Sequence, residues 1–442
     1  MKEADRSEIR RAVIKWALYW FLVAVIYVTL SLIFNNFVVY SLILALAAVN
    51  FLLRIFFYLP FHRFQHKWVR IGIRLFTSAV SITLTVILCI HIIANGTSYN
   101  NRFISSFDYS GFTHSSEISY DDETGVYTVR ATGDELKILQ LTDVHICAGI
   151  TTLATDRKAL TACYEIIREA RPDLIIVTGD MVYPVPLASF NSNNLVPIYQ
   201  FCTFMNNIGI PWAFVYGNHD TEKSAQYGSD SFAGIFRHFK YLPDCPMLYA
   251  DKQPSIYGRY NQYLRVENRD GSLNRLIFLI DSNDYVKGSD KINDYDSVHP
   301  DQIEWYEETI HSVSEKEGNT VPSFVFMHIP FKEFADAQSA LERGSGDAKY
   351  ILGENGEKVS YPDRDSGFFD AILSAGSTEA VFVGHDHLNN LAVNYKGIDL
   401  VYGKSIDYIA YPKIARQTAQ RGGTLITVTK EGYSLQHIDY SD

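Results

Sequence analysis

The chain has 442 residues, of which 47% are hydrophobic and 20% charged, a composition that excludes a disordered or collagen-like protein. Its net charge of -11 lacks the basic excess of a dedicated nucleic-acid binder, so no nucleic-acid partner is expected. Residues 1–99 nevertheless hold 10 basic and 3 acidic side chains, whereas residues 100–442 hold 29 and 47. An asymmetry of this size predicts two different environments for the two parts.

The first part contains three long apolar runs. They predict membrane spans over residues 16–34, 37–59 and 75–94, within a membrane domain of residues 1–94. Each run is close to the roughly 20 residues that a helix needs to cross a bilayer. A buried helical core is the alternative for one run, but three such runs in succession favour membrane helices. Further spans follow the first run, which argues against a cleaved signal peptide.

The basic residues of the first part lie before the first run and between the second and third runs. An excess of Lys and Arg in short loops marks the cytoplasmic side of a membrane. We therefore expect an integral membrane protein with its N-terminus in the cytoplasm and its C-terminal domain outside the cytoplasm.

The region after the third run changes character twice. Residues 95–134 are polar and rich in Ser, Asp, Gly and Tyr, and are interpreted as a tether. From 135 to 442, short apolar runs alternate with amphipathic stretches, which predicts one large α/β domain. Predicted strands cover residues 136–141, 174–178, 212–216, 276–280, 323–327, 380–383, 391–394, 398–402 and 424–428. Predicted helices cover residues 157–169, 197–208, 300–313 and 367–374.

Five of these strands run directly into Asp, Asn or His. The blocks are Asp143-x-His145, Gly179-Asp180, Gly217-Asn218-His219-Asp220, His328 and Gly384-His385-Asp386-His387. One block alone is weak evidence, because an Asp after a strand is commonly part of a turn or a helix cap. Five together are a strong signal, because ligands in α/β sheets gather outside the carboxyl ends of the strands. The glycines fit sharp turns that bring backbone close to such a site.

Carboxylate and imidazole side chains suit Mn, Fe or Zn better than a metal that prefers thiolates. A carboxylate shared between two ligand groups would allow a two-metal site. Such a site clamps the attacking and leaving oxygens of an in-line displacement.

In order and spacing, the blocks resemble the calcineurin-like metallophosphoesterase superfamily over residues 135–440. The resemblance implies a β-sandwich flanked by helices, with a dinuclear metal centre at the strand ends. It implies that the first metal is held by Asp143, His145, Asp180 and His387. It implies that Asp180 also bridges to a second metal, held with Asn218, His328 and His385. His219 would face the phosphate and assist the leaving oxygen, with Asp220 orienting its ring.

Finer features are similar to the purple acid phosphatase-like branch of that superfamily. Residues 179–183 fit the pattern GDxxY. In true purple acid phosphatases the first block is DxG and the tyrosine is an iron ligand, whereas here His145 occupies the ligand position. Tyr183 is therefore interpreted as a supporting or structural side chain.

The resemblance implies a phosphoesterase that hydrolyses a phosphate monoester or diester with a metal-activated hydroxide, and the predicted spans make it a membrane-anchored one. Its cofactors would be two divalent or mixed-valence ions of Mn, Fe or Zn, and lipid-linked phosphates are among the candidate substrates. Two alternatives stay open: an extracytoplasmic pseudoenzyme that binds or senses a partner, and a signalling module in residues 1–94 with the phosphatase as its output. Loops over the site, which would select the substrate, are expected at residues 183–195, 221–231, 281–299 and 331–365.

Overall fold

The computed structural model describes residues 100–149, 152–184, 191–291, 293–411, 414 and 421–441, together with scattered residues between 14 and 83. The chain divides into a first unit, Met1–Tyr99 with Phe190–Ser192, and a second unit that holds the other residues from Asn100 onward. The predicted spans at 16–34, 37–59 and 75–94 lie outside the described residues, apart from isolated helical positions. Among the residues that are described, no helix has both the length and the apolarity needed to cross a bilayer.

The second unit is built from alternating strands and helices. Its strands are β1 (Ser116–Asp121), β2 (Val126–Ala131), β3 (Glu135–Leu141), β4 (Leu174–Thr178), β5 (Trp212–Val215), β6 (Gln262–Glu267), β7 (Leu273–Leu279), β8 (Ser323–Phe326), β9 (Ala348–Leu352), β10 (Thr378–Val383), β11 (Ala392–Tyr395), β12 (Ile398–Tyr402), β13 (Gly422–Thr429) and β14 (Tyr433–Asp439). Its helices are α4 (Leu153–Ala170), α6 (Leu195–Ile208), α7 (Ser229–Lys240), α8 (Pro300–Glu317), α9 (Glu333–Glu342) and α10 (Phe368–Ala375).

The strands form two mixed sheets. One has the order β1-β2-β6-β7-β8-β10-β12-β11-β9, and the other has the order β14-β13-β3-β4-β5. Within the second sheet β3, β4 and β5 run parallel, and within the first sheet β7, β8, β10 and β12 run parallel. Each sheet therefore collects several carboxyl strand ends at one edge, where ligand sites of α/β proteins form.

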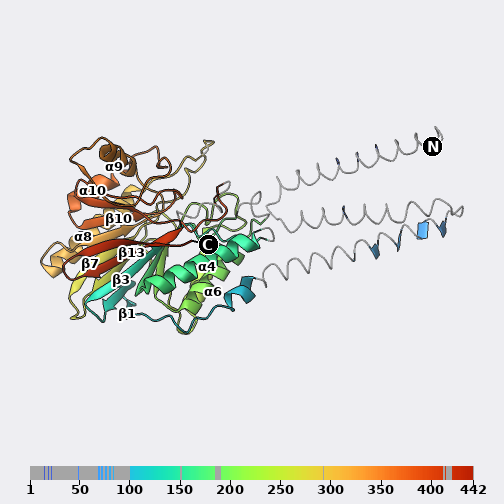
Figure 1. The fold of residues 1–442 in the computed structure, drawn as a ribbon, viewed down its shortest axis with the longest axis horizontal. Coiled ribbons are helices and arrows are strands. Elements are labelled where there is room, and N and C mark those ends of the chain that lie inside the picture. The colour runs from blue at the N-terminus through green and yellow to red at the C-terminus, as the bar shows by residue number, and fades with distance from the viewer. Residues whose placement is uncertain are drawn as a thin grey trace. The chain divides into compact units, whose positions relative to one another are not determined.

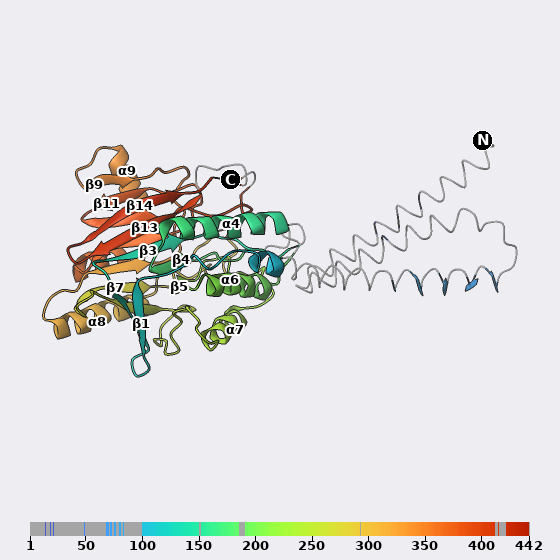
Figure 2. The ribbon, with the colours of Figure 1, turned by 60° about the horizontal axis from the view of Figure 1, so that its bottom comes forward.

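Alternating side chains place each sheet between another sheet and a helix layer. In β4, Ile175 and Val177 pack in the core that includes α4, α6 and α7, whereas Ile176 faces the core between the sheets. In β8, Phe324 faces that central core and Val325 faces α8, α9 and α10. Successive strand residues point to opposite faces, so strands apolar at every position fit a sheet covered on both sides. Figures 1 and 2 show the helices on the outer sides of the strands.

The predicted tether over residues 95–134 is corrected from residue 100 onward. β1 and β2 form an antiparallel pair, and β2 pairs in parallel with β6. Tyr127 and Val129 of β2 are buried in the central core. The sequence concealed β1 because it is an edge strand with mostly exposed side chains, which gives little apolar alternation. The second unit therefore begins well before the predicted boundary at 135.

The four helices predicted within residues 135–442 all occur with slightly different bounds, whereas α7 and α9 were not predicted. α7 follows the turn after β5, and α9 lies with β9 inside the segment 331–365 that was expected to be a loop.

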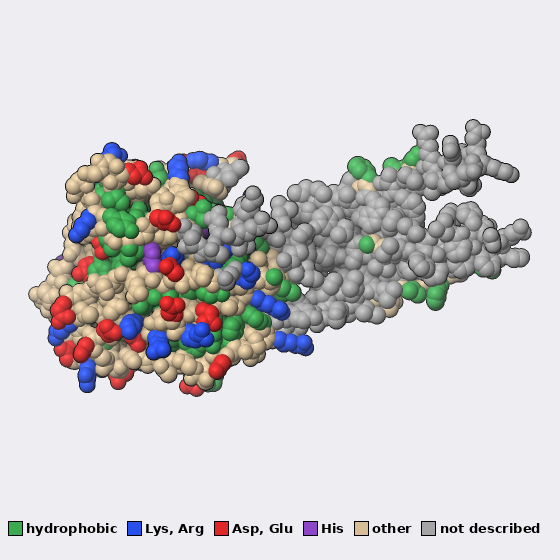
Figure 3. Space-filling model, viewed as in Figure 1, with side chains coloured by type: hydrophobic (Ala, Val, Ile, Leu, Met, Phe, Trp, Pro, Cys, Tyr) green, Lys and Arg blue, Asp and Glu red, His purple; other side chains and the backbone are tan. Residues whose placement is uncertain are grey.

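On the face drawn in Figure 3, basic and acidic side chains of the described residues are interspersed. That face therefore carries no large field of one sign.

Candidate metal centre

The seven predicted ligands come together at the carboxyl ends of strands from both sheets. β3, β4 and β5 run into Asp143, Asp180 and Asn218, whereas β8 and β10 run into His328 and the segment from His385 to His387. Backbone hydrogen bonds join these strand exits: the His145 amide donates to the Asp180 carbonyl at 3.0 Å, and the Gly384 amide donates to the His328 carbonyl at 3.1 Å.

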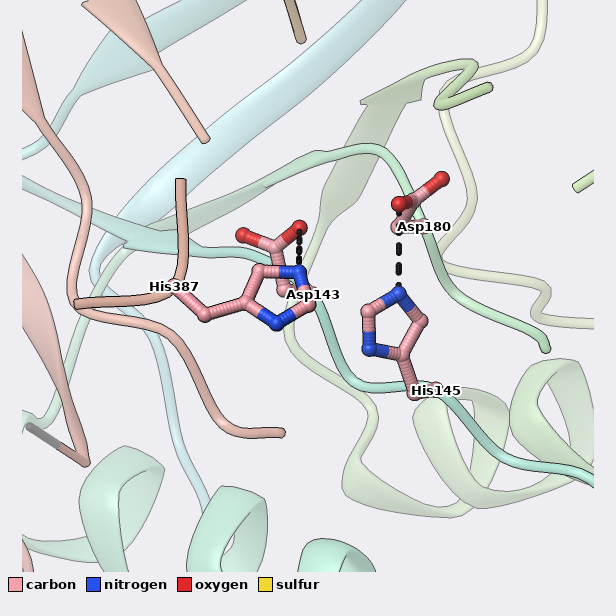
Figure 4. Close-up of side chains that lie close together, drawn as sticks. All are labelled: Asp143, His145, Asp180 and His387. Atoms are coloured by element: carbon pink, nitrogen blue, oxygen red, sulfur yellow. Dashed lines mark hydrogen bonds and ion pairs between the residues drawn. The ribbon is translucent and has the colours of Figure 1, made fainter. Parts of the chain in front are cut away.

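The first ligand group consists of Asp143, His145, Asp180 and His387. All four side chains are buried, and each offers a ligand atom within 4.8 Å of the others. Nε2 of His145 lies 3.1 Å from Oδ2 of Asp180, and Nε2 of His387 lies 3.5 Å from Oδ1 of Asp143. Figure 4 shows the two histidine rings reaching the two carboxylates from separate segments of the chain. These are the four residues that the resemblance implied for the first metal, and their role as its ligands stays a prediction.

The second group meets the first at a single oxygen atom. Oδ2 of Asp180, which is 3.1 Å from Nε2 of His145, is also 3.3 Å from Nε2 of His328. The other oxygen, Oδ1, accepts the backbone N–H of His219 at 2.8 Å, which fixes the carboxylate. Oδ2 of Asp180 thus has the position that a bridging ligand needs.

The remaining members of the second group surround His328. Oδ1 of Asn218 lies 3.1 Å from Nε2 of His328, and the His385 and His328 ring centroids are 5.2 Å apart. Nδ1 of His328 donates to the Thr178 carbonyl at 2.7 Å, so in the neutral ring the lone pair that can bind a metal is on Nε2. Nδ2 of Asn218 donates to the Tyr285 hydroxyl at 2.9 Å, which leaves Oδ1 to face the group.

Several ligand residues have backbone conformations that L-amino acids rarely adopt. The φ angles are 53° at Asp143, 53° at His145, 49° at Asp180 and 77° at His385. Left-handed backbone at a residue other than glycine costs roughly 1–3 kcal/mol and is concentrated at functional sites. Stability is therefore given up at the strand exits to aim these side chains at a common point.

Glycine allows the strand exits to approach one another. A Cβ atom at Gly217 would lie 2.1 Å from Oδ1 of Asp180, and one at Gly179 would lie 2.6 Å from the Gly217 nitrogen. Gly179 also has a φ of 84°, in the left-handed region. These contacts give the physical reason for the glycines that the sequence pattern singled out.

The electrostatics of the site favour buried anions with cationic partners. Burial disfavours ionisation of Asp143, but the charge of His387 beside it holds the pKa of this carboxyl below its usual range. Burial works against a charged His328 as well, yet the adjacent Asp180 raises its pKa to about 9. Buried carboxylates need compensating positive charge. The buried oxygen and nitrogen donors around the Asp180 carboxylate therefore form a cluster able to bind metal.

The His219 and Asp220 side chains have different hydrogen-bond partners. Nδ1 of His219 lies 3.0 Å from Oε2 of Glu222, and the His219 side chain is 22% exposed. The Asp220 carboxylate accepts the backbone N–H groups of Gly217 at 2.8 Å and of Val182 at 3.1 Å. The expectation that Asp220 orients the His219 ring is therefore corrected: Glu222 lies against the ring, while Asp220 is turned inward and closes the backbone turn.

Tyr183 lies against two site histidines, in keeping with its interpretation as a supporting side chain. Its ring centroid is 5.0 Å from that of His145 and 4.8 Å from that of His219. Burial raises the pKa of its hydroxyl above the usual range.

Several side chains that support the site were not predicted from the sequence. Arg259 pairs with Asp281 at 2.6 Å and donates to the Gly217 carbonyl at 2.9 Å, which braces the turn before Asn218. Asp156 of α4 accepts the backbone N–H groups of Cys147 and Ala148, two and three residues after His145, at 3.1 and 2.8 Å. Asn100 in turn donates to Asp156 at 3.0 Å. The contacts of Arg259 with Gly217 and of Asn100 with Asp156 join residues more than 40 positions apart, so no local pattern could reveal them.

The class of protein follows from comparison with known families. Residues 136–389 match the family described as calcineurin-like phosphoesterase, and this chain belongs to that family. All seven candidate ligands and His219 lie within the matched residues.

Particular relatives come from plants and yeast. The chain is 28% identical over 314 residues to "Probable inactive purple acid phosphatase 14" of Arabidopsis thaliana, covering 64% of this chain and 73% of the relative. It is 27% identical to "Probable inactive purple acid phosphatase 29" of the same plant, covering 63% of this chain and 74% of the relative. It is 25% identical to "Phosphatase DCR2" of Saccharomyces cerevisiae, covering 68% of this chain but only 53% of the relative.

Among solved structures, the fold of this chain is similar to that of a dimetal phosphatase from Danio rerio, with a TM-score of 0.39 and 12% sequence identity. The similarity covers 69% of this chain and 99% of the zebrafish chain. The family assignment does not depend on that likeness.

Proposed function

We propose that this chain is a dinuclear metal-dependent phosphoesterase that hydrolyses phosphate esters. The observation that carries the proposal is the position of Oδ2 of Asp180, within 3.1–3.3 Å of a histidine from each ligand group. None of the ligand types implied by the family resemblance has been replaced by a residue unable to bind a metal.

Each part of the site has a role in this reaction. Asp143, His145 and His387 would hold one metal, Asn218, His328 and His385 would hold the other, and Asp180 would contact both. Bound metal ions supply Lewis acidity, which lowers the pKa of water and neutralises charge on phosphoryl oxygens. His219, oriented by Glu222 and partly exposed, would donate a hydrogen bond to the departing ester oxygen. Asp220 and Arg259 would keep the Gly217 turn in shape.

A second candidate function is a metal-binding pseudoenzyme, because two of the relatives carry the word "inactive" in their names. Hydrolysis of p-nitrophenyl phosphate and bis-p-nitrophenyl phosphate by the purified full chain, with Mn, Fe, Zn or Mg, separates the two candidates. We expect turnover that requires metal and is lost in Asp180→Asn. Metal binding without turnover of either ester would favour the pseudoenzyme, and the absence of metal binding would reject both.

We also propose that the chain is anchored in a membrane by residues 16–34, 37–59 and 75–94, with its N-terminus in the cytoplasm and its phosphoesterase domain outside it. The three long apolar runs and the loop charges support this arrangement. Leu18, Phe21, Leu75 and Phe76 are helical and between 62% and 69% exposed, as lipid-facing side chains would be. An anchor of this kind would bring the site close to phosphate esters at the membrane surface, including lipid-linked ones.

Two measurements test the anchor and its direction. The full chain should stay with membranes after alkaline extraction, and a protease added to intact cells should cut the domain that begins at residue 100. Release by alkali would contradict the anchor, and protection from the external protease would contradict the direction. A higher rate on phosphatidic acid in vesicles than on a soluble monoester would support a lipid-linked substrate.

A further inference from the structure

A carboxylate that lies outside the matched family segment contacts two of the candidate metal ligands. Asp407 follows β12 and lies beyond residues 136–389. Its side chain is fully buried, with Oδ1 3.2 Å from Nδ1 of His145 and Oδ2 2.9 Å from Nδ1 of His387. The two imidazole rings, 4.8 Å apart between centroids, therefore share one carboxylate.

The segment around Asp407 is fixed to the strand end that carries Asp143. Thr142 and Ser405 pair as a parallel bridge, and the Ile406 amide donates to the Thr142 carbonyl at 3.1 Å. Oδ1 of Asp407 also accepts the backbone N–H groups of Ile409 at 2.7 Å and Ala410 at 2.9 Å. These bonds hold the carboxylate in place independently of the two histidines.

An acceptor at Nδ1 determines which nitrogen of each ring is available as a ligand. A carboxylate next to Nδ1 keeps the proton on that atom, so Nε2 presents its lone pair. Nε2 of His145 faces Oδ2 of Asp180, and Nε2 of His387 faces Oδ1 of Asp143. Both lone pairs thus point into the first ligand group. A carboxylate behind a ligand histidine also raises the basicity of that ligand.

We propose that Asp407 is the positioning residue for the first metal and fixes the orientation and tautomer of both His145 and His387. The proposal rests on the proposed two-metal site, because the two histidines act as ligands there. Asp407 would not contact substrate, and its effect would pass through the two rings.

The informative variant is Asp407→Asn in the full chain. Asparagine keeps the size of the side chain and one oxygen for the backbone N–H groups of Ile409 and Ala410. Its amide nitrogen is a donor, so it cannot accept from a second imidazole N–H. The matched control is Asp399→Asn, which removes a carboxylate in β12 that accepts hydrogen bonds from Asn394 and Tyr433.

Two measurements are needed, beginning with zinc titration against a chromogenic chelator. We expect Asp407→Asn to weaken one of two zinc sites about 10–100-fold, the usual effect of removing a carboxylate behind a histidine ligand. The other site and the Asp399→Asn control should remain close to wild type. The thermal midpoint of the metal-free protein should be similar in the two variants.

The second measurement is the NMR signal of the imidazole N–H protons in zinc-loaded protein with isotope-labelled histidine. The signals of His145 and His387 should shift in Asp407→Asn, while that of His328, which donates to the Thr178 carbonyl, should stay in place. Unchanged affinity at both zinc sites, or unchanged His145 and His387 signals, would overturn the proposal. An affinity loss matched by an equal loss of metal-free stability would also overturn it, because the role would then be structural. Wild-type protein that binds no zinc would instead reject the two-metal site itself.

Discussion

The two ligand groups differ in the charge of the side chains and carbonyls that contact their ligand residues. In the first group, His145 and His387 are backed by the negative charge of Asp407. In the second group, His328 is backed by the neutral Thr178 carbonyl and Asn218 by the neutral Tyr285 hydroxyl. Charged partners make imidazole a stronger donor than neutral ones do, so the first group should bind its metal more tightly. The second metal should exchange more easily, although both groups share Asp180.

Asp180→Asn should abolish metal binding by both ligand groups, and with it the difference in their affinities. The amide retains an oxygen but loses the negative charge that both histidines face at 3.1 and 3.3 Å. We expect neither site to hold metal at micromolar concentration and hydrolysis to fall to background. Metal analysis and phosphatase assay of the same sample check this. A variant that still binds one metal tightly would show that Asp180 does not bridge.

His219→Ala should leave the two groups intact and affect only the reaction. Loss of a general acid lowers the rate by about 10²–10⁴-fold, so kcat should fall by that factor at constant metal content. Glu222→Gln should also lower kcat, but by a smaller factor, because Glu222 acts through the His219 ring. Equal metal content with wild-type kcat in His219→Ala would contradict its role. A substrate with a better leaving group should lessen the loss.

Gly217→Ala should displace Asp180, whose carboxylate is shared by the two ligand groups. The new methyl group would overlap Oδ1 and the backbone nitrogen of Asp180, at 2.1 and 2.2 Å. Overpacking of this kind costs about 1–3 kcal/mol of folding free energy, and displacement of Asp180 should weaken both metals. Gly234→Ala is the matched control, since it lies in α7 with no heavy atom within 4 Å of the added carbon. It should stabilise the protein by up to about 1 kcal/mol in the same denaturation experiment. Equal effects of the two substitutions would contradict the close approach.

Tyr285→Phe should affect the second group alone. It removes the hydroxyl that accepts from Asn218 at 2.9 Å, a neutral hydrogen bond worth about 1 kcal/mol. We expect roughly a fivefold loss of affinity at the weaker site and no change at the tighter one, measured by the same chelator titration. A loss at the tighter site would reverse the assignment of the two groups.

The ligands could be predicted from the sequence because each follows an apolar strand, and parallel strands bring their carboxyl ends to one edge. The supporting side chains could not be predicted in this way. Asp407 lies on a segment after β12 that has no motif, and its contact with His145 joins positions far apart in the chain. Glu222 was overlooked because Asp220 is adjacent to His219 in sequence, although the turn points Asp220 toward the Gly217 amide.

The fold shows the same division between what apolar patterns reveal and what they conceal. Strands covered on both sides, such as β4 and β8, are buried at every position and largely apolar, and they were predicted almost to the residue. β1, with one buried residue, and β9, with none, were assigned to a tether and a loop because they lack that signal. Edge strands and surface helices depend on contacts with the rest of the domain, which composition alone does not encode.

The hydrogen bond from Asn100 to Asp156 determines where the chain can be truncated without disturbing the domain. Asp156 accepts the amides of Cys147 and Ala148, close after His145, and Asn100 is one of the partners that keep this buried carboxylate satisfied. A fragment that starts at residue 135, where the domain boundary was first predicted, would also lose β1 and β2 and leave β6 as an open sheet edge. Expression fragments of the phosphoesterase domain should therefore begin before residue 100, and proteolysis just after that residue should loosen the loop beside the metal site.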